Sequence, residues 1–186
     1  MSEALRARRY PFVANGEEPL EALRATRADV RVRACPEARH YVLRARSAPE
    51  LTAALEAGEG VSLPLEPNTS QGFDHGDVLW LSPTEWLMVR RDERAPLLDE
   101  RWWLDQTSGY AALEVSGAEA PELIAAGCSV DVHPRSFPPR RCAQTLFAKT
   151  SIVLFCVDGA PTYRLTVRRS HAAHLWRWIA LNLELL

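Results

Sequence analysis

The C-terminal segment, from about Ser170 onward, has apolar residues at helical spacing on two faces, and this constrains the fold more than any other part of the chain. The first face, with spacings of three and four residues, carries Ala172, Leu175, Trp176, Ile179, Leu183 and Leu186. The second face, nearly opposite, carries Trp178, Leu181 and Leu185. Such a helix is either sandwiched inside its own fold or docked on another protein, and a chain of 186 residues has little interior for the first arrangement. We therefore expect a partner protein.

Two neighbouring runs near the N-terminus have the period of two that is typical of strands. Apolar residues occupy every second position of residues 30–35 and of residues 41–46, and most of the intervening residues are arginines. The turn-forming segment Pro36–Arg39 separates the runs. We expect a hairpin with one arginine-rich face in water.

A helix is predicted directly after this hairpin. Ser47 with Glu50 three residues later forms a capping-box pattern, and Gly58 and Gly60 end the apolar periodicity. A second helix is expected to end at Gly127. The other strands predicted by pattern are 78–81, 86–89, 111–115, 143–149, 152–157 and 162–168.

Each half of the chain therefore combines strands with a helix, which predicts an α+β fold built from antiparallel sheets. We divide the chain into three parts. Residues 1–28 form an N-terminal arm without a sustained strand pattern, residues 29–100 a first α+β unit, and residues 101–186 a second α+β unit with the C-terminal helix.

Charge and hydropathy exclude two classes of partner. Lys plus Arg is 22 and Asp plus Glu is 24, so the net charge is 22 − 24 = −2, which argues against nucleic acid and anionic membrane. The longest uncharged apolar run, Ile152–Val157, falls far short of the roughly 20 residues of a membrane span. Because no apolar signal segment follows the N-terminal arginines, we expect a cytoplasmic protein.

The chain lacks the Gly-rich motifs that bind dinucleotides or nucleoside triphosphates, so it is not expected to bind FAD, NAD or ATP by those routes. Its cysteines form no Cys-x-x-Cys pair, and we expect them to be reduced and mostly buried. They are Cys35, Cys128, Cys142 and Cys156.

Two short patterns contain residue types that could form a chemical site. Cys128, Asp131 and His133 could form a metal or thiolate site, but a cysteine directly after a helix end is the usual place for a small buried residue. His171 and His174 could reach one metal, but no third ligand has matching spacing. We predict no catalytic, cofactor-binding or metal-ligating residue.

An acidic segment and a pair of tryptophans are explained by structure rather than by chemistry. The segment Asp74–Asp77 is interpreted as a surface turn, because it lacks the ligand count of a calcium loop. Adjacent tryptophans of a strand point to opposite faces, so two alternatives stay open for Trp102 and Trp103: at least one ring is a surface anchor for a partner, or both rings are covered by the chain itself.

Two groups of motifs resemble the gamma subunit family of heterotetrameric sarcosine oxidase. In the first half they are Leu63-Pro64, Pro67-Asn68 and the run Val78–Leu87. In the second half they are Gly127–Pro139, Cys142–Thr145, Val167–Ser170 and Leu175–Trp178. The resemblance covers about residues 50–186 and excludes the arm.

The resemblance implies a non-catalytic subunit, with a structural and assembly role, in a heterotetramer of alpha, beta, gamma and delta chains. Such a complex demethylates sarcosine oxidatively to glycine, passes the one-carbon unit to tetrahydrofolate and passes electrons to oxygen. FAD, FMN, NAD and tetrahydrofolate are then expected on the partner chains, and none of them on this chain.

The resemblance also implies a fold similar to the folate-binding region of glycine-cleavage aminomethyltransferase, with two intertwined small antiparallel-sheet-plus-helix units. Where that enzyme carries an Asn-x-x-Gly-Gly-x-x-Asp-Asp loop, this chain has Ala148–Leu154, which contains no acidic residue. This departure favours a structural subunit over two alternatives. One is a stand-alone folate-binding or aminomethyltransferase-like protein, and the other is a metal or thiol enzyme based on Cys128, Asp131 and His133.

We expect the partner interface to use charged groups near turns and a tryptophan from the second face of the C-terminal helix. Charged and forked side chains near turns can bond a partner's backbone. The expected interface residues are Asp131, His133, Arg135, Arg168, Arg169 and Trp178.

Overall fold

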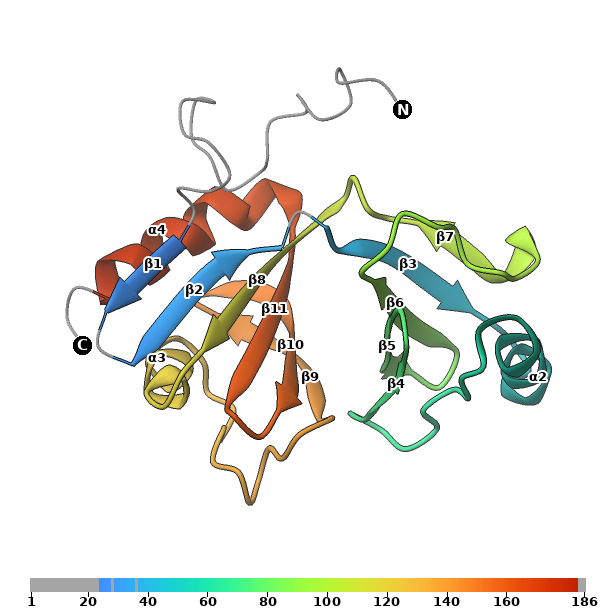
Figure 1. Ribbon diagram of the computed structural model, residues 1–186, viewed down its shortest axis with the longest axis horizontal. Coiled ribbons are helices and arrows are strands. Elements are labelled where there is room, and N and C mark those ends of the chain that lie inside the picture. The colour runs from blue at the N-terminus through green and yellow to red at the C-terminus, as the bar shows by residue number, and fades with distance from the viewer. Residues whose placement is uncertain (1–23, 28, 36, 184–186) are drawn as a thin grey trace.

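The structure, a computed structural model, describes residues 24–27, 29–35 and 37–183, and Figure 1 shows two sheets with helices on their outer faces. The strands are β1 (Arg24–Arg27), β2 (Val30–Ala34), β3 (Arg39–Arg44), β4 (Ser70–Phe73), β5 (Gly76–Ser82), β6 (Glu85–Arg90), β7 (Trp103–Asp105), β8 (Tyr110–Ser116), β9 (Cys142–Phe147), β10 (Thr150–Asp158) and β11 (Thr162–Arg168). The helices are α2 (Ala48–Glu59), α3 (Ala120–Gly127) and α4 (Ala172–Leu183), with short 3-10 turns η2 (Glu100–Trp102) and η3 (Arg169–His171).

Every strand pair in the two sheets is antiparallel, which confirms the predicted α+β class. The first sheet has the order β1-β2-β8-β11-β10-β9, and the second has the order β4-β5-β6-β3-β7. β2 thus joins strands from the second half of the chain, and β7 joins strands from the first half. This exchange intertwines the two units, as the resemblance implied.

The hairpin predicted for residues 30–46 is wrong. β2 pairs with β1 and β8, whereas β3 pairs with β6 and β7 in the other sheet. β3 is buried on both faces, since His40 and Val42 point one way and Tyr41 and Leu43 the other. A hairpin with one face in water would expose half of these side chains. They are buried because β3 lies between β6 and β7 in a sheet that is covered on both faces.

The N-terminal segment contains a strand that the sequence pattern did not predict. β1 lies at the edge of the first sheet and pairs with β2. The rest of the predicted arm, residues 1–23 and residue 28, lies outside the described residues.

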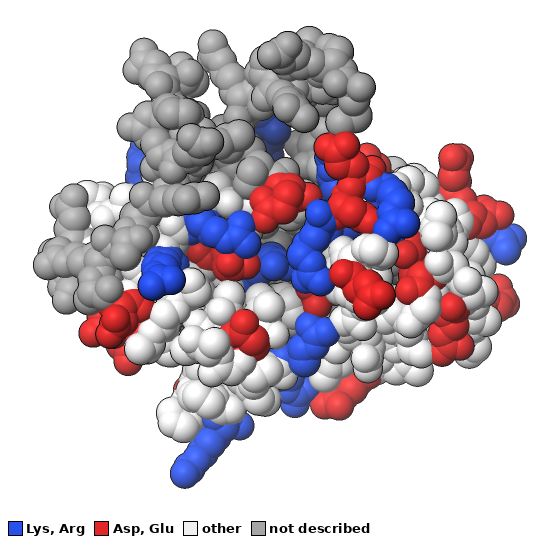
Figure 2. Space-filling view, viewed as in Figure 1, with Lys and Arg blue, Asp and Glu red and all other residues white. Residues whose placement is uncertain are grey.

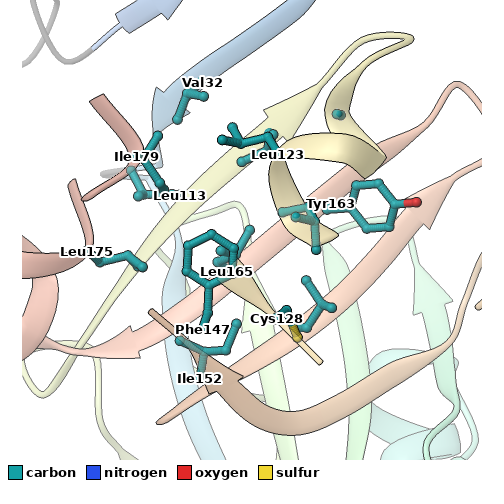
Figure 3. Close-up of a cluster of buried hydrophobic side chains, with 14 of the residues drawn as sticks. Val32, Leu113, Leu123, Cys128, Phe147, Ile152, Tyr163, Leu165, Leu175 and Ile179 are labelled. Atoms are coloured by element: carbon teal, nitrogen blue, oxygen red, sulfur yellow. The ribbon is translucent and has the colours of Figure 1, made fainter. Parts of the chain in front are cut away.

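The first sheet packs one face against α3 and α4 (Figures 1 and 3). Every second residue of its strands points into this cluster, because successive side chains of a strand alternate between faces. Figure 3 shows the cluster, which includes Val32, Leu113, Leu123, Phe147, Ile152, Leu165, Leu175 and Ile179.

The other face of the first sheet meets the second sheet. This middle layer is formed by apolar residues such as Leu79, Leu87, Val153 and Phe155, together with charged groups described below. The outer face of the second sheet packs Trp86 and Met88 against Leu51 and Leu55 of α2. The result is a four-layer arrangement of helices, sheet, sheet and helix, without a helix between the sheets.

The predicted first helix forms, although its ends differ from the sequence pattern. Ser47 is the N-cap residue but makes no side-chain capping hydrogen bond, and the helix continues past Gly58 to Gly60. Gly60 ends it with φ +68°, a left-handed conformation that glycine adopts without a Cβ penalty. Nearby, the buried Arg90 guanidinium forms ion pairs with Glu59 and with Asp92, so an ion pair also joins the end of α2 to β6.

The C-terminal helix buries its first predicted face. Ala172, Leu175, Ile179 and Leu183 are buried, while Leu181 of the second face is 65% exposed. Within the described part of the chain, no helix has the length and hydropathy that a membrane span requires.

We expect Trp86→Phe to lower the free energy of unfolding by about 1–3 kcal/mol, because the buried indole Nε1 donates to the carbonyl oxygen of Pro64 at 2.9 Å and the substitution leaves that acceptor unpaired. Urea unfolding measures the loss. Trp80→Phe, on the adjacent strand and only partly buried, is the control and should change stability much less. Equal losses for both variants would contradict the assigned role of the hydrogen bond.

Candidate functional site

Three of the predicted interface residues lie on one exposed loop between α3 and β9. Asp131 Oδ1 accepts a hydrogen bond from the backbone N–H of His133, and its Oδ2 accepts one from the Ser136 hydroxyl. These bonds, that of the hydroxyl first, hold the pKa of Asp131 below its usual value. The backbone N–H of Arg135 donates to His133 Nδ1. The loop therefore holds the Asp131 and His133 side chains in place at the surface, with Arg135 exposed beside them.

Arg168 and Arg169 follow one another at the end of β11. The Arg168 guanidinium stacks on the Tyr110 ring at 4.5 Å from its centroid and donates to Gln106 Oε1 at 3.4 Å. The backbone N–H of Arg169 donates to the carbonyl oxygen of Gly109. Both arginines are thus tied to the start of β8 rather than to the loop of Asp131.

The structure does not bring the two groups together. The loop is attached near the start of β11, where the Tyr163 hydroxyl donates to the carbonyl oxygen of Val132 at 3.2 Å. Arg168 lies five residues further along the same strand, which is roughly 17 Å at 3.3 Å per residue. A partner that contacts both groups must therefore span the length of β11.

Trp178 packs against its own chain. Its ring meets Phe147 edge-on, with centroids 4.9 Å apart and planes at 80°, and a Cβ added at Gly127 would lie 2.9 Å from it. The ring is only partly buried, so the interface role expected for Trp178 stays a prediction beside this internal contact. Trp102 and Trp103 are also partly buried and pack against the outer cluster of the second sheet, as the covered alternative expected.

The structure gives no support for a metal or thiolate site formed by Cys128 with Asp131 and His133 in the described part of the chain. Cys128 is 8% exposed, and its Sγ lies 3.6 Å from Thr145 Oγ1, on β9. Burial raises the pKa of Cys35 and of Cys142 to about 12 and that of Cys156 to about 11, so these thiols stay protonated at neutral pH. Within the described ranges, no three His, Cys, Asp or Glu side chains are grouped as metal ligands.

A buried charge network between the sheets was missed by the sequence analysis. Asp77, interpreted there as part of a surface turn, lies in β5 with its side chain 3% exposed. Its Oδ1 accepts from Arg140 Nη1 at 2.6 Å, and its Oδ2 lies 3.4 Å from Arg91 Nη1 and 3.5 Å from Arg164 Nη1. One carboxylate therefore pairs with the second sheet, the first sheet and the loop before β9.

The network continues across the first sheet. Arg164 Nη2 donates to Glu114 Oε2 at 3.3 Å, and Arg33 Nε donates to Glu114 Oε1 at 2.8 Å. Figure 2 shows basic side chains gathered over the line between the sheets with acidic ones beside them. The burial of Asp77 could have been predicted from the alternation of the strand, because Asp77 lies on the same face of β5 as the buried Leu79 and Leu81.

His40 completes the middle layer. It is 1% exposed, its ring lies 5.6 Å from that of Tyr110, and neither ring nitrogen has a hydrogen-bond partner among the described residues. Burial, with the positive charge of Arg164 as a smaller cause, lowers the pKa of His40 to about 4. The imidazole is therefore neutral at physiological pH.

The stretch that replaces the acidic loop of aminomethyltransferases is a tight hairpin turn. Ala148 and Lys149 connect β9 to β10 with φ of 49° and 63°. Two positive φ angles are the signature of a type I′ turn, which joins strands directly and leaves no loop. The stretch therefore places Lys149, and no carboxylate, at this end of the first sheet.

Comparison with known proteins gives a consistent result. The family model described as "Sarcosine oxidase, gamma subunit family" matches residues 44–182. The sarcosine oxidase subunit gamma of Corynebacterium sp. (strain P-1) is 30% identical over 136 residues, and that of Arthrobacter sp. is 29% identical over 137 residues. Each match covers 68% of this chain and 66% of the relative.

Two solved structures have similar folds. A chain of the heterotetrameric sarcosine oxidase from Corynebacterium sp. U-96, in complex with pyrrole 2-carboxylate, matches with a TM-score of 0.77 and 28% identity over 89% of each chain. The glycine cleavage system aminomethyltransferase T from Bartonella henselae matches with a TM-score of 0.59 and 11% identity, over 83% of this chain and 46% of that one. The second likeness concerns the fold alone and confirms the expected similarity of fold to aminomethyltransferase.

We expect Asp77→Asn to destabilise the protein by roughly 1–3 kcal/mol, because it removes one of the two carboxylate partners of the buried Arg164, which keeps Glu114, while Arg91 and Arg140 can turn toward water. Chemical denaturation measures the change. Asp74→Asn, three residues earlier and exposed, removes the same charge and should stay within about 0.5 kcal/mol of the unchanged protein. A similar small effect for Asp77→Asn would show that the network is dispensable.

Stability should fall by about 3 kcal/mol as the pH drops from 6.5 to 4. The pKa of His40 in the folded chain, about 4, lies below the ordinary histidine value of 6.5, so in this window the unfolded chain binds a proton that the folded chain does not. Unfolding free energies across this range test the effect. His40→Phe should lack this part of the pH dependence, and His133→Gln, on the exposed loop, should retain it. Parallel curves for all three proteins would rule out His40 as the cause.

Proposed function

The chain belongs to the sarcosine oxidase gamma subunit family, and on that basis we propose that it is the gamma chain of a heterotetrameric sarcosine oxidase. Its role in this proposal is structural: it assembles with alpha, beta and delta chains and carries no reaction centre of its own. The observation that carries the proposal is the agreement with a chain of a solved heterotetrameric sarcosine oxidase over 89% of each chain. The chain matches the curated relatives over 66% of their length. The role of the whole gamma subunit is therefore part of the proposal.

The proposed complex oxidises sarcosine. Sarcosine, tetrahydrofolate and oxygen give glycine, methylenetetrahydrofolate and hydrogen peroxide, with two electrons passing through flavin to oxygen. FAD, FMN, NAD and tetrahydrofolate are bound by the partner chains in this proposal, and the reaction takes place in the cytoplasm. The residues of this chain contribute by binding and orienting those chains.

The exposed groups described above suggest how it docks. Charged side chains that are already held in place lose little conformational freedom on binding, which favours them in an interface. Asp131 and His133 meet this condition through side-chain hydrogen bonds within their loop, and Arg168 meets it through its stacking on Tyr110. Arg135 belongs to the proposed interface through its exposed place on the same loop. We include in the proposed interface Arg169, which follows Arg168, and the partly buried Trp178, which also supports β9 through Phe147.

The stand-alone alternative is less well supported. Its basis is the likeness to an aminomethyltransferase at 11% identity, which concerns fold alone. The corresponding stretch is a two-residue turn without a carboxylate. An acid placed to polarise a folate or amine nitrogen is therefore missing from that position.

A tagged form of the chain, purified gently from its host, should bring down larger chains with visible flavin absorption and sarcosine-dependent peroxide formation. Absorption spectra and a peroxide assay on the eluate test this. An unrelated tagged protein of similar size is the control for non-specific capture. A colourless single chain without oxidase activity would contradict the proposed function.

The cofactor assignment is tested on the same material. Denaturation of the assembled complex should release flavin. Denaturation of the chain purified alone should release none. Flavin or folate bound stoichiometrically by the separate chain would contradict the placement of cofactors on the partners.

A further inference from the structure

The first sheet leaves part of its inner face uncovered at one end. A groove of about 580 Å³ lies there, lined by residues of β8, β9, β10 and β11 and by Ser129. Thr166 and Val153 of its floor are buried, whereas the next residues on the same face, Arg168 and Ser151, are exposed. The second sheet therefore stops short of this end, and side chains that would otherwise be enclosed form an open floor.

The groove lies beside an edge strand. β9 is the last strand of the first sheet, and among the described residues its outer edge is bonded only at its ends. The Cys142 N–H donates to the Asn68 carbonyl, and Phe147 bridges to Cys128. Leu146, between them, is 54% exposed and lines the groove. An exposed edge strand with an exposed leucine is a surface that another chain commonly covers.

Among the described residues, the one charged side chain that lines the groove is the cation Arg168. From Cys142 to Leu183 the sequence has a single carboxylate, Asp158, and five cations, Lys149, Arg164, Arg168, Arg169 and Arg177. Asp158 ends β10, five residues and roughly 17 Å from Val153, the nearest lining residue of that strand. Asp105, Glu114 and Asp131 are the carboxylates closest in sequence to the other lining residues, and none of the three lines the groove.

Arg168 provides the cation inside the groove. Unlike Arg33, Arg140 and Arg141, it forms no ion pair within the part of the chain that the structure describes. Its guanidinium is held over Tyr110 and can offer its fork of N–H donors to a carboxylate. Lys149 and His174 lie on the adjoining turn and helix, with His174 Nε2 3.0 Å from the carbonyl oxygen of Ala148.

We propose that this groove binds an extended acidic segment of a partner subunit, with a carboxylate on Arg168 and an apolar side chain on Leu146. This inference rests on the proposed function and names the part of the chain that performs it. Charge complementarity selects the acidic segment, and the exposed Leu146 and edge strand select a polypeptide over a small anion. A small ligand needs a pocket that encloses most of its surface, whereas Leu146, Gln144, Ser151 and Arg168 are all open to solvent.

The test uses the tagged full chain co-expressed with its partner subunits, in the unchanged form and with R168E or L146D. Both residues are exposed, so the variants should melt at nearly the same temperature as the unchanged chain. The flavoprotein retained per tagged chain is measured after washing at about 0.1 M and about 0.5 M salt. We expect R168E and L146D to retain at least about tenfold less, with the loss for R168E larger at low salt.

Two matched variants serve as controls. R46E reverses an exposed charge on the loop before α2, and L97D alters a leucine that is 61% exposed, and neither residue lines the groove. Both should retain flavoprotein like the unchanged chain. If R168E and L146D also retain it fully, the groove proposal is overturned while the proposed function stands. If the unchanged chain itself retains none, both are overturned.

A small anion as occupant is a separate outcome. It would be indicated if succinate or inorganic phosphate raised the melting temperature of the chain in an Arg168-dependent manner while R168E still assembled normally. That result would also overturn the proposal. No melting shift with these anions, together with loss of assembly in R168E, supports it.

Discussion

The buried carboxylate of Asp77 is the constraint on which the arrangement of the two sheets depends. A charge that is 3% exposed is costly unless it is paired, and its partners come from β6–β7, from β11 and from the loop before β9. The sheets can therefore approach only in an alignment that presents these guanidinium groups. Apolar side chains such as Leu87 and Phe155 supply the attraction between the sheets, because burial of apolar area is the larger favourable contribution. We therefore infer that the ion network determines how the two sheets align and that apolar burial supplies most of the stability.

This arrangement decides which surfaces remain for other proteins. The outer faces of both sheets are covered by helices, and their inner faces cover each other. The parts left open are the ends of strands and the loops between them. The loop of Asp131 lies at one end of β11 and Arg168 at the other, so the docking groups are separated by the length of a strand. A subunit with this distribution suits contact with large partners more than enclosure of a small molecule.

Several parts of the structure were predictable from sequence because local rules control them. The helix around Leu51 and Leu55, the helix that ends at Gly127 and the core-facing side of α4 follow from apolar spacing. The resemblance to a family was carried by strings such as Gly127–Pro139 and proved correct. The strand at 30–34 was also found, but its pairing was not, since a period of two reports which side chains share a face and carries no information about the neighbouring strand.

The sequence by itself determined the α+β class, the positions of the helices and of the strands other than β1, β4 and β7, the family and the absence of an acidic residue in Ala148–Leu154. Only the tertiary structure decided that β2 and β7 exchange sheets, that Asp77 and His40 are buried between them, and that Trp178 contacts Phe147. The first group depends on residues within a few positions of each other. The second depends on contacts such as Asp77 with Arg140 and Arg164, which join residues far apart in the chain and exist only once both sheets have formed.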